Sequence, residues 1–229
     1  MKRNSLLLPL WAALSFTALA QTHIPATGIC NTGLTPASPL PAGCTTSTLV
    51  TPVNPDTGGT SVDGNWQLAT PYPSAGVASQ APNPCSLTFG PAWVDAPFGN
   101  WIAPDAGVSQ WITPEVATTD PAGWYIYRTP VSVPAATPGY PSYILTVIGK
   151  VATDNDTPGI VLGSGRKCTL LSIPALQGQG IWSEFGFETL VAPSTQPYLY
   201  FLTYNASSNT ANPTGVVVEF ISATFTPSQ

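Results

Sequence analysis

The chain has 229 residues, of which 43% are hydrophobic and only 7% are charged. Two of its six basic residues, Lys2 and Arg3, lie at the N-terminus, so the remainder carries four bases against eleven acids, a net charge of −7. This balance argues against binding to nucleic acid, whose phosphates require basic surfaces, and equally against binding to an anionic membrane surface.

Residues 1–20 have the features of a secretory signal peptide. A positively charged start precedes an apolar stretch from Leu6 to Leu19, and Ala18–Ala20 is a small-x-small cleavage sequence. The apolar stretch is short for a membrane span, which needs about 20 residues. We therefore expect the mature chain, from Gln21, to be secreted, to lack a membrane span and to be free to form disulfides.

Residues 21–60 are predicted to form an N-terminal arm or linker before a folded domain at 61–229. The segment is crowded with Pro, Thr, Ser and Gly and has no apolar period of a strand or a helix. An arm fastened onto the domain is favoured over an independent module.

Four cysteines, Cys30, Cys44, Cys85 and Cys168, are an even number for an oxidising compartment, which predicts two disulfides. Of the three pairings, Cys30–Cys44 with Cys85–Cys168 is favoured, because the first two cysteines share the N-terminal segment. Zinc binding is disfavoured, since no CxxC spacing occurs.

From Val62 onward, short runs rich in β-branched and aromatic residues alternate with turn residues. The predicted strands are Trp66–Thr70, Ala92–Asp95, Gly123–Val133, Ser142–Ala152, Gly159–Leu162, Lys167–Ile173, Ile181–Thr189, Pro197–Tyr204 and Val216–Phe225. The many prolines disfavour helices. We expect an all-β fold, a two-sheet antiparallel β-sandwich of jelly-roll type.

Four strings keep the order found in a group of secreted bacterial β-sandwich domains. They are Ser109–Pro114 (SQWITP), Gly123–Thr129 (GWYIYRT), Ala152–Asn155 (ATDN) and Asn212–Glu219 (NPTGVVVE). In this order, over residues 62–226, the chain resembles an uncharacterised branch of the galactose-binding-like jelly rolls. Leu162-Gly163 departs from the resemblance, because it lacks the Asn of the usual Leu-Asn-Gly hairpin. The resemblance implies a fold and a binding or structural role, and no reaction.

The sequence Asp154-Asn155-Asp156 is the densest cluster of oxygen donors in the chain and lies between a predicted strand and Pro158-Gly159. Capping of the turn by these side chains is the favoured interpretation. A structural calcium ion, which prefers six to eight oxygen ligands, is the alternative, and a ligand site is the third. No other cofactor is expected.

Six tryptophans remain in the mature chain, and three of them, Trp93, Trp101 and Trp111, lie between Phe89 and Pro114. Exposed Trp faces can stack on the apolar faces of sugar rings. Packing is favoured for each tryptophan, with stacking as the alternative. If a binding surface exists, this Pro-rich segment is where we expect it, because loops at one end of a rigid sandwich commonly carry recognition.

Arg128 is the only basic residue of its predicted strand. It could bind a ligand carboxylate through paired hydrogen bonds. An ion pair with Glu219 or Glu184 is the favoured alternative.

The sequence has few residues in the arrangements that hydrolytic enzymes require. The only histidine, His23, lies beside the cleavage sequence, so a Ser-His-Asp triad lacks a base. Glu184 and Glu188, four residues apart on a predicted strand, would lie about 13 Å apart, whereas a glycosidase pair needs roughly 5 to 9.5 Å.

We therefore expect a secreted, non-catalytic module that binds carbohydrate or a cell-surface partner. The alternative is a structural subunit of an extracellular matrix, sheath or filament, which would self-associate. A glycoside hydrolase or lyase comes third.

Overall fold

The computed structural model describes residues 22–49, 61–72, 81–114, 120–155, 159–172, 180–206 and 212–229. The predicted signal peptide and Asp156 lie outside the described residues. The elements are β1 (Ile24–Pro25), β2 (Thr48–Leu49), β3 (Ser61–Tyr72), η1 (Pro84–Ser86), β4 (Gly90–Asp95), β5 (Trp111–Thr113), β6 (Gly123–Pro130), β7 (Ser142–Asp154), β8 (Gly159–Ser164), β9 (Lys167–Ser172), β10 (Ser183–Val191), β11 (Tyr198–Asn205) and β12 (Gly215–Ser228). In the described part of the chain, no helix is long and apolar enough to cross a membrane.

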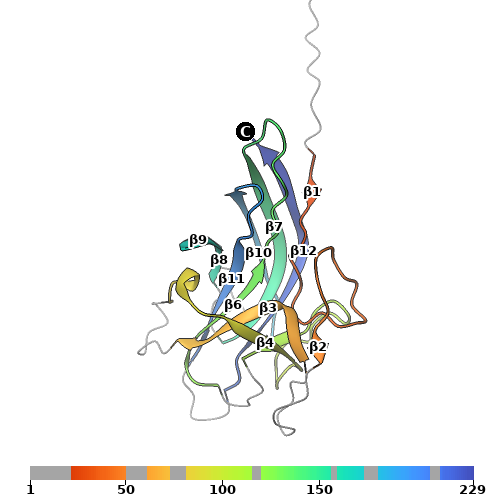
Figure 1. Cartoon of the computed structure of the whole chain (residues 1–229). Helices are drawn as coiled ribbons and strands as arrows, with labels where there is room; N and C mark the ends of the chain where they lie inside the picture. Colours follow the sequence, from red (N-terminus) through yellow and green to blue (C-terminus); the bar gives the residue numbers. More distant parts are fainter. Residues whose placement is uncertain are drawn as a thin grey trace, which may run out of the picture.

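All strand pairs are antiparallel, and they form one hydrogen-bonded sheet in the order β10-β7-β12-β5-β4-β3-β6-β11-β8-β9. β1 pairs with β12, and β2 pairs with β3. In Figure 1 the long strands β7 and β12 run side by side along the molecule, and β3 and β4 cross the lower half.

The core lies between two halves of this sheet, which pack face to face. Phe185 of β10 lies 5.7 Å, centroid to centroid, from Phe201 of β11, and Trp66 of β3 lies 5.3 Å from the same ring. The main cluster of buried apolar residues draws on β7, β10 and β12 from one half and on β3, β6, β8 and β11 from the other. Burial of such large side chains is the dominant stabilising contribution.

The expected all-β, antiparallel sandwich architecture is confirmed. The two halves are continuous with one another, because β5 pairs with β4 along its whole length and with β12 at Val216 and Ile112. The two-sheet jelly-roll arrangement stays a prediction, because the strands form one hydrogen-bonded sheet.

The described part of the predicted N-terminal arm lies on the sandwich. β1 pairs with β12, and Ile29 joins the main core. The carbonyl of Cys30 accepts a 2.9 Å hydrogen bond from the indole N–H of Trp66, which is itself 1% exposed. Residues 22–34 thereby contribute backbone and side chains to the domain.

Both favoured disulfides are present. Cys30 is bonded to Cys44, and Cys85 in η1 is bonded to Cys168 in β9. The second bond spans 83 residues and fastens the segment before β4 across the outer face of the sheet.

Candidate functional site

Trp101 and Trp111, two of the predicted stacking residues, are buried. Trp111 is fully inaccessible and Trp101 is 7% exposed, and their ring centroids lie 4.2 Å apart. The indole N–H of Trp111 donates a 2.9 Å hydrogen bond to the carbonyl of Ile102. Neither ring offers a face to a ligand here, so their geometry matches the favoured interpretation, which is packing.

Trp93 and Arg128, the other two predicted binding residues, lie on one outer face of the sheet. Pro91 of β4, Gln67 of β3, Arg128 of β6 and Tyr200 of β11 are register partners across four neighbouring strands. Side chains alternate along a strand, so Trp93 points to the same face as Pro91, while the residues between and beyond them are buried. The register of the sheet therefore gathers residues that are distant in sequence.

Arg128 is held between two aromatic rings. Its guanidinium carbon lies 3.8 Å from the centroid of Phe89 and 4.2 Å from that of Tyr198, both distances typical of cation–π contact. Its Nε donates a 2.8 Å hydrogen bond to Gln67. The hydrogen bond from Arg128 also opposes the effect of burial, which raises the pKa of Tyr200.

The favoured ion pair of Arg128 with Glu219 or Glu184 is wrong. Glu219 pairs instead with Lys150 on the other half of the sheet, and Glu184 is exposed on β10. β6 and β12 are separated in the sheet by β3, β4 and β5, which explains why the two side chains do not meet.

A groove of about 430 Å³ lies beside Arg128 on the β3–β4 side. Its lining includes the half-buried rings of Phe89 and Trp93 together with Pro91 and Pro114. We call these four residues the aromatic groove. Because Phe89 contacts both the groove and the guanidinium of Arg128, an apolar surface and a cation adjoin at this point.

The segment that carries Phe89 is fixed by the second disulfide. Cys85 and Leu87 pack with Phe89 onto a cluster on the outer face of β6, β8 and β11, which includes Tyr200 and Ile126. Asn83 begins η1 by accepting a hydrogen bond from the backbone N–H of Cys85. The disulfide and the packing of Cys85 and Leu87 therefore fix the position of Phe89 on the sheet.

A second, larger groove of about 510 Å³ lies between the end of β4 and the β4–β5 loop. Its described lining includes Val94, Asp95, Pro97, Ser109 and Gln110, and no aromatic ring. Both grooves therefore border the segment from Phe89 to Pro114, for which we predicted a binding surface from the sequence.

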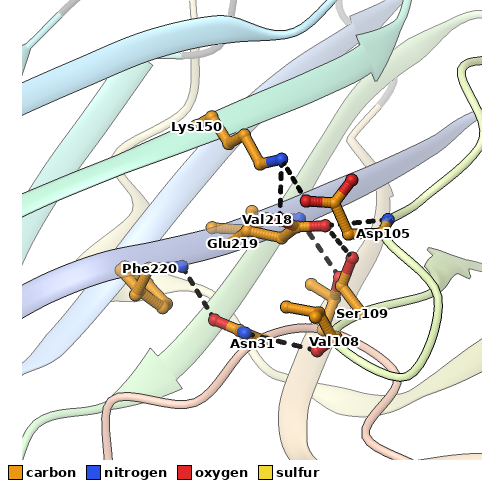
Figure 2. Close-up of polar contacts among 9 residues, drawn as sticks. Asn31, Asp105, Val108, Ser109, Lys150, Val218, Glu219 and Phe220 are labelled. Atoms are coloured by element: carbon orange, nitrogen blue, oxygen red, sulfur yellow. Dashed lines mark hydrogen bonds and ion pairs between the residues drawn. The ribbon is translucent and has the colours of Figure 1, made fainter.

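The β4–β5 loop is fastened by an ion-pair network (Figure 2). Lys150 Nζ lies 2.7 Å from Asp105 Oδ2 and 2.8 Å from Glu219 Oε2. The other Glu219 oxygen, Oε1, accepts hydrogen bonds from the Ser109 hydroxyl and the Asp105 backbone N–H. Glu219 is 3% exposed, and these contacts compensate the burial of its charge. The hydrogen bond from Lys150 lowers the pKa of Asp105.

The N-terminal segment enters the same network. Asn31 accepts a 2.7 Å hydrogen bond from the backbone N–H of Phe220 and donates to the carbonyl of Val108 (Figure 2). The hydroxyl of Thr32 accepts from the backbone N–H of Val218. The first described segment, the β4–β5 loop and the last strand are thereby joined.

Asp154 and Asn155 hydrogen-bond each other and a distant segment, and the turn-capping interpretation stays a prediction, because residues 156–158 of the turn lie outside the described residues. Asp154 is 4% exposed and accepts hydrogen bonds from the side chains of Asn155 and Trp101, while burial raises its pKa. Asn155 Oδ1 accepts from the backbone N–H of Ala206. Among the described residues, no group of three or more His, Cys, Asp or Glu side chains is placed to hold a metal ion. The third predicted calcium ligand, Asp156, lies outside them.

Asp120 is a buried carboxylate that no sequence pattern points to. It is 8% exposed and accepts a 2.8 Å hydrogen bond from the backbone N–H of Thr214. Burial, with added repulsion from Asp154 and Asp95, raises its pKa to about 6. In the sequence, Asp120 precedes Pro and resembles an ordinary turn residue.

Sequence reasoning also missed Gln67, Phe89 and Tyr198 as neighbours of Arg128. A signal existed for Tyr198, because it alternates with the buried Leu199 and shares a face with Tyr200. The positions of Gln67 and Phe89 depend on the β3–β6 register and on the disulfide, and neither is encoded locally.

No protein-family model matches this chain, and no curated protein shows significant similarity to it.

Proposed function

We propose that this protein is a secreted, non-catalytic carbohydrate-binding module whose binding site is the aromatic groove together with Arg128. The observation that carries the proposal is the position of the half-buried Phe89 ring, which lines the groove together with Trp93 and also contacts the guanidinium of Arg128.

Sugar recognition needs both an aromatic surface and polar groups that form hydrogen bonds. Each pyranose ring has an apolar C–H face, which packs on aromatic rings, and an edge of hydroxyls, which takes hydrogen bonds. Trp93 and Phe89 supply rings, and Arg128 and Gln67 supply polar groups beside them. Because the residues lie on paired strands and on a disulfide-fixed segment, little ordering entropy is lost on binding.

Three further observations support the proposal. The chain resembles galactose-binding-like jelly rolls, and that resemblance implies a binding or structural role. The predicted signal peptide at residues 1–20 and the two disulfides suit an oxidising, extracellular compartment. The two grooves border the one segment for which the sequence predicts recognition.

The test is retention of the purified protein by immobilised polysaccharides in affinity electrophoresis, followed by titration of the retained ones. Trp93→Ala should weaken binding by at least tenfold, which corresponds to about 1.4 kcal/mol. Phe98→Ala is the matched control, because Phe98 is an exposed ring, 43% accessible, outside the lining of the groove.

Wild-type affinity retained by a folded Trp93→Ala variant would place binding elsewhere. Folding of each variant is checked by near-ultraviolet circular dichroism and by the melting temperature. No retention of the wild type on any polysaccharide would remove the proposal.

A structural subunit that self-associates is the second candidate. Ile148, Ile221 and Leu190 are 48%, 64% and 65% exposed, and Leu190 faces Ile144 on the outer side of the β7–β10 pair. Apolar side chains gathered on one sheet face favour contact with a second copy. The described arm residues pack on their own domain, so they give this candidate no support. Sedimentation velocity of wild type and Leu190→Glu distinguishes an assembling protein from a monomer.

A further inference from the structure

Arg128 is a cation without an acidic partner among the described residues. The only ion pairs there are those that Lys150 makes with Asp105 and Glu219. Arg128 instead contacts two rings and the neutral Gln67, and its hydrogen bond to Gln67 is open to solvent. The chain has few bases, and this half-buried guanidinium is held at a fixed position with no carboxylate beside it among the described residues.

The hydrogen-bonding capacity of Arg128 is only partly used. A guanidinium has five N–H donors in one plane. One donates to Gln67 and one interacts with Tyr200, while Phe89 and Tyr198 lie over the guanidinium. The remaining in-plane donors suit the two oxygens of a carboxylate, which arginine binds through parallel hydrogen bonds.

Arg166 and Lys167 add positive charge to the same half of the sheet as Arg128. Lys150 is neutralised by its two carboxylates. Arg166 and Lys167 are exposed at the β8–β9 turn, and β8 pairs with β11, the strand next to β6. The three bases without ion pairs in the described structure therefore lie on the β6-β11-β8-β9 part of the sheet, whereas Glu184 and Glu188 lie on β10.

We infer that the ligand of this site is an acidic polysaccharide built of uronic acids. This inference rests on the proposed carbohydrate-binding function and narrows its ligand class. The apolar face of a uronate ring packs on Trp93, and its carboxylate binds the free donors of Arg128. The neighbouring bases of the β8–β9 turn favour further carboxylates along an extended chain. A neutral polysaccharide has no carboxylate to pair with the positive charge of Arg128.

The experiment compares polymers that differ only in charge. Polygalacturonate and alginate are the acidic probes, and the methyl ester of the first and the propylene glycol ester of the second are their neutral counterparts. The wild type should bind at least one acidic probe at least tenfold more tightly than its ester. That preference should shrink as salt is added, because salt screens exposed charges.

Arg128→Gln should reduce the preference for the acidic polymer to about twofold or less, because it weakens binding to the acid far more than binding to the ester. Arg166→Gln removes the same charge from the β8–β9 turn and should lose less of the preference than Arg128→Gln. Phe98→Ala, outside the lining of the groove, is the control and should retain the full preference. Trp93→Ala should weaken binding to the acidic and the neutral polymer alike.

The outcomes separate the two proposals. Equal binding of acid and ester by the wild type, or an undiminished acid preference in folded Arg128→Gln, overturns the uronate inference and leaves carbohydrate binding intact. No binding of these probes, with retention on a neutral glycan that depends on Trp93, also overturns it. No binding of any polysaccharide removes both proposals.

Discussion

The pair formed by Trp101 and Trp111 shows what a large aromatic residue does when a Pro-rich loop must be held without regular structure. Their two rings, tilted by 33° to one another, pack against Ala152 of β7 and Val217 of β12. Trp111 bonds the carbonyl of Ile102, and Trp101 hydrogen-bonds Asp154. Each indole thus removes apolar area from water and satisfies a polar group of the loop or a strand end.

Trp111→Ala should therefore cost about 3 to 5 kcal/mol of unfolding free energy, as large buried aromatics do. Binding by the protein that remains folded should not change, because the ring lies outside the aromatic groove. Urea denaturation followed by circular dichroism measures the loss. Phe98→Ala, at an exposed position of the same loop, should cost less than about 1 kcal/mol, and an equal loss in both variants would contradict the packing role.

At the level of strands, sequence pattern predicts those elements that bury their own alternating or continuous apolar residues. All nine predicted strands are present, with ends shifted by a few residues. β5 was missed because it has only three residues and lies inside the Pro-rich loop, and its strand character comes from pairing with β4. β1 and β2 have two residues each and exist only as partners of longer strands.

The same distinction holds for the candidate site. Residue type alone was enough to select Trp93 and Arg128 as candidate binding residues. Their common face required the register of β4, β3 and β6, and the burial of Trp101 required the tertiary course of the loop. Local sequence holds neither kind of information.

The Cys85–Cys168 disulfide holds η1 on the sheet, so removing it measures how much this link stabilises the fold. The pair of changes Cys85→Ser and Cys168→Ser should cost about 4 kcal/mol, since the bond closes a long loop in the unfolded chain. Loss of the Cys30–Cys44 bond, with a separation of 14 residues, should cost about 3 kcal/mol in the same chain-entropy account. Chemical denaturation of both double variants measures the two losses, and a larger loss from the shorter loop would contradict this account.

For the whole molecule, buried carboxylates set the response to pH. The pKa values of Asp63, Asp95, Asp120 and Asp154 are all raised, chiefly by burial. A carboxyl whose folded pKa exceeds its unfolded value binds protons more strongly in the folded state. Stability therefore falls as pH rises through the window between the two values, which for Asp120 runs from 3.8 to about 6.

We accordingly expect the denaturation midpoint to be higher at pH 5 than at pH 7, with Asp120 contributing about 1 kcal/mol of that difference. Asp120→Asn should keep an oxygen for the Thr214 N–H and should reduce the pH dependence. Glu184→Gln, at an exposed site on β10, is the control and should leave the pH dependence as in the wild type. A free energy of unfolding that rises from pH 5 to pH 7 would contradict the claim that buried carboxyls with raised pKa values control the pH dependence.

The contacts of Asn31 and Thr32 with β12 also determine when the molecule can become complete during its synthesis. Asn31 bonds the backbone of Phe220 across 189 residues, and Thr32 bonds Val218 across 186. The ribosome makes residues 31 and 32 long before β12, so their bonds to Val108 and Gln110 of the β4–β5 loop can form earlier than their bonds to β12. Contacts of such long range fold slowly. The native contacts of residues 22–34 with β12 are therefore completed only after β12 has been synthesised.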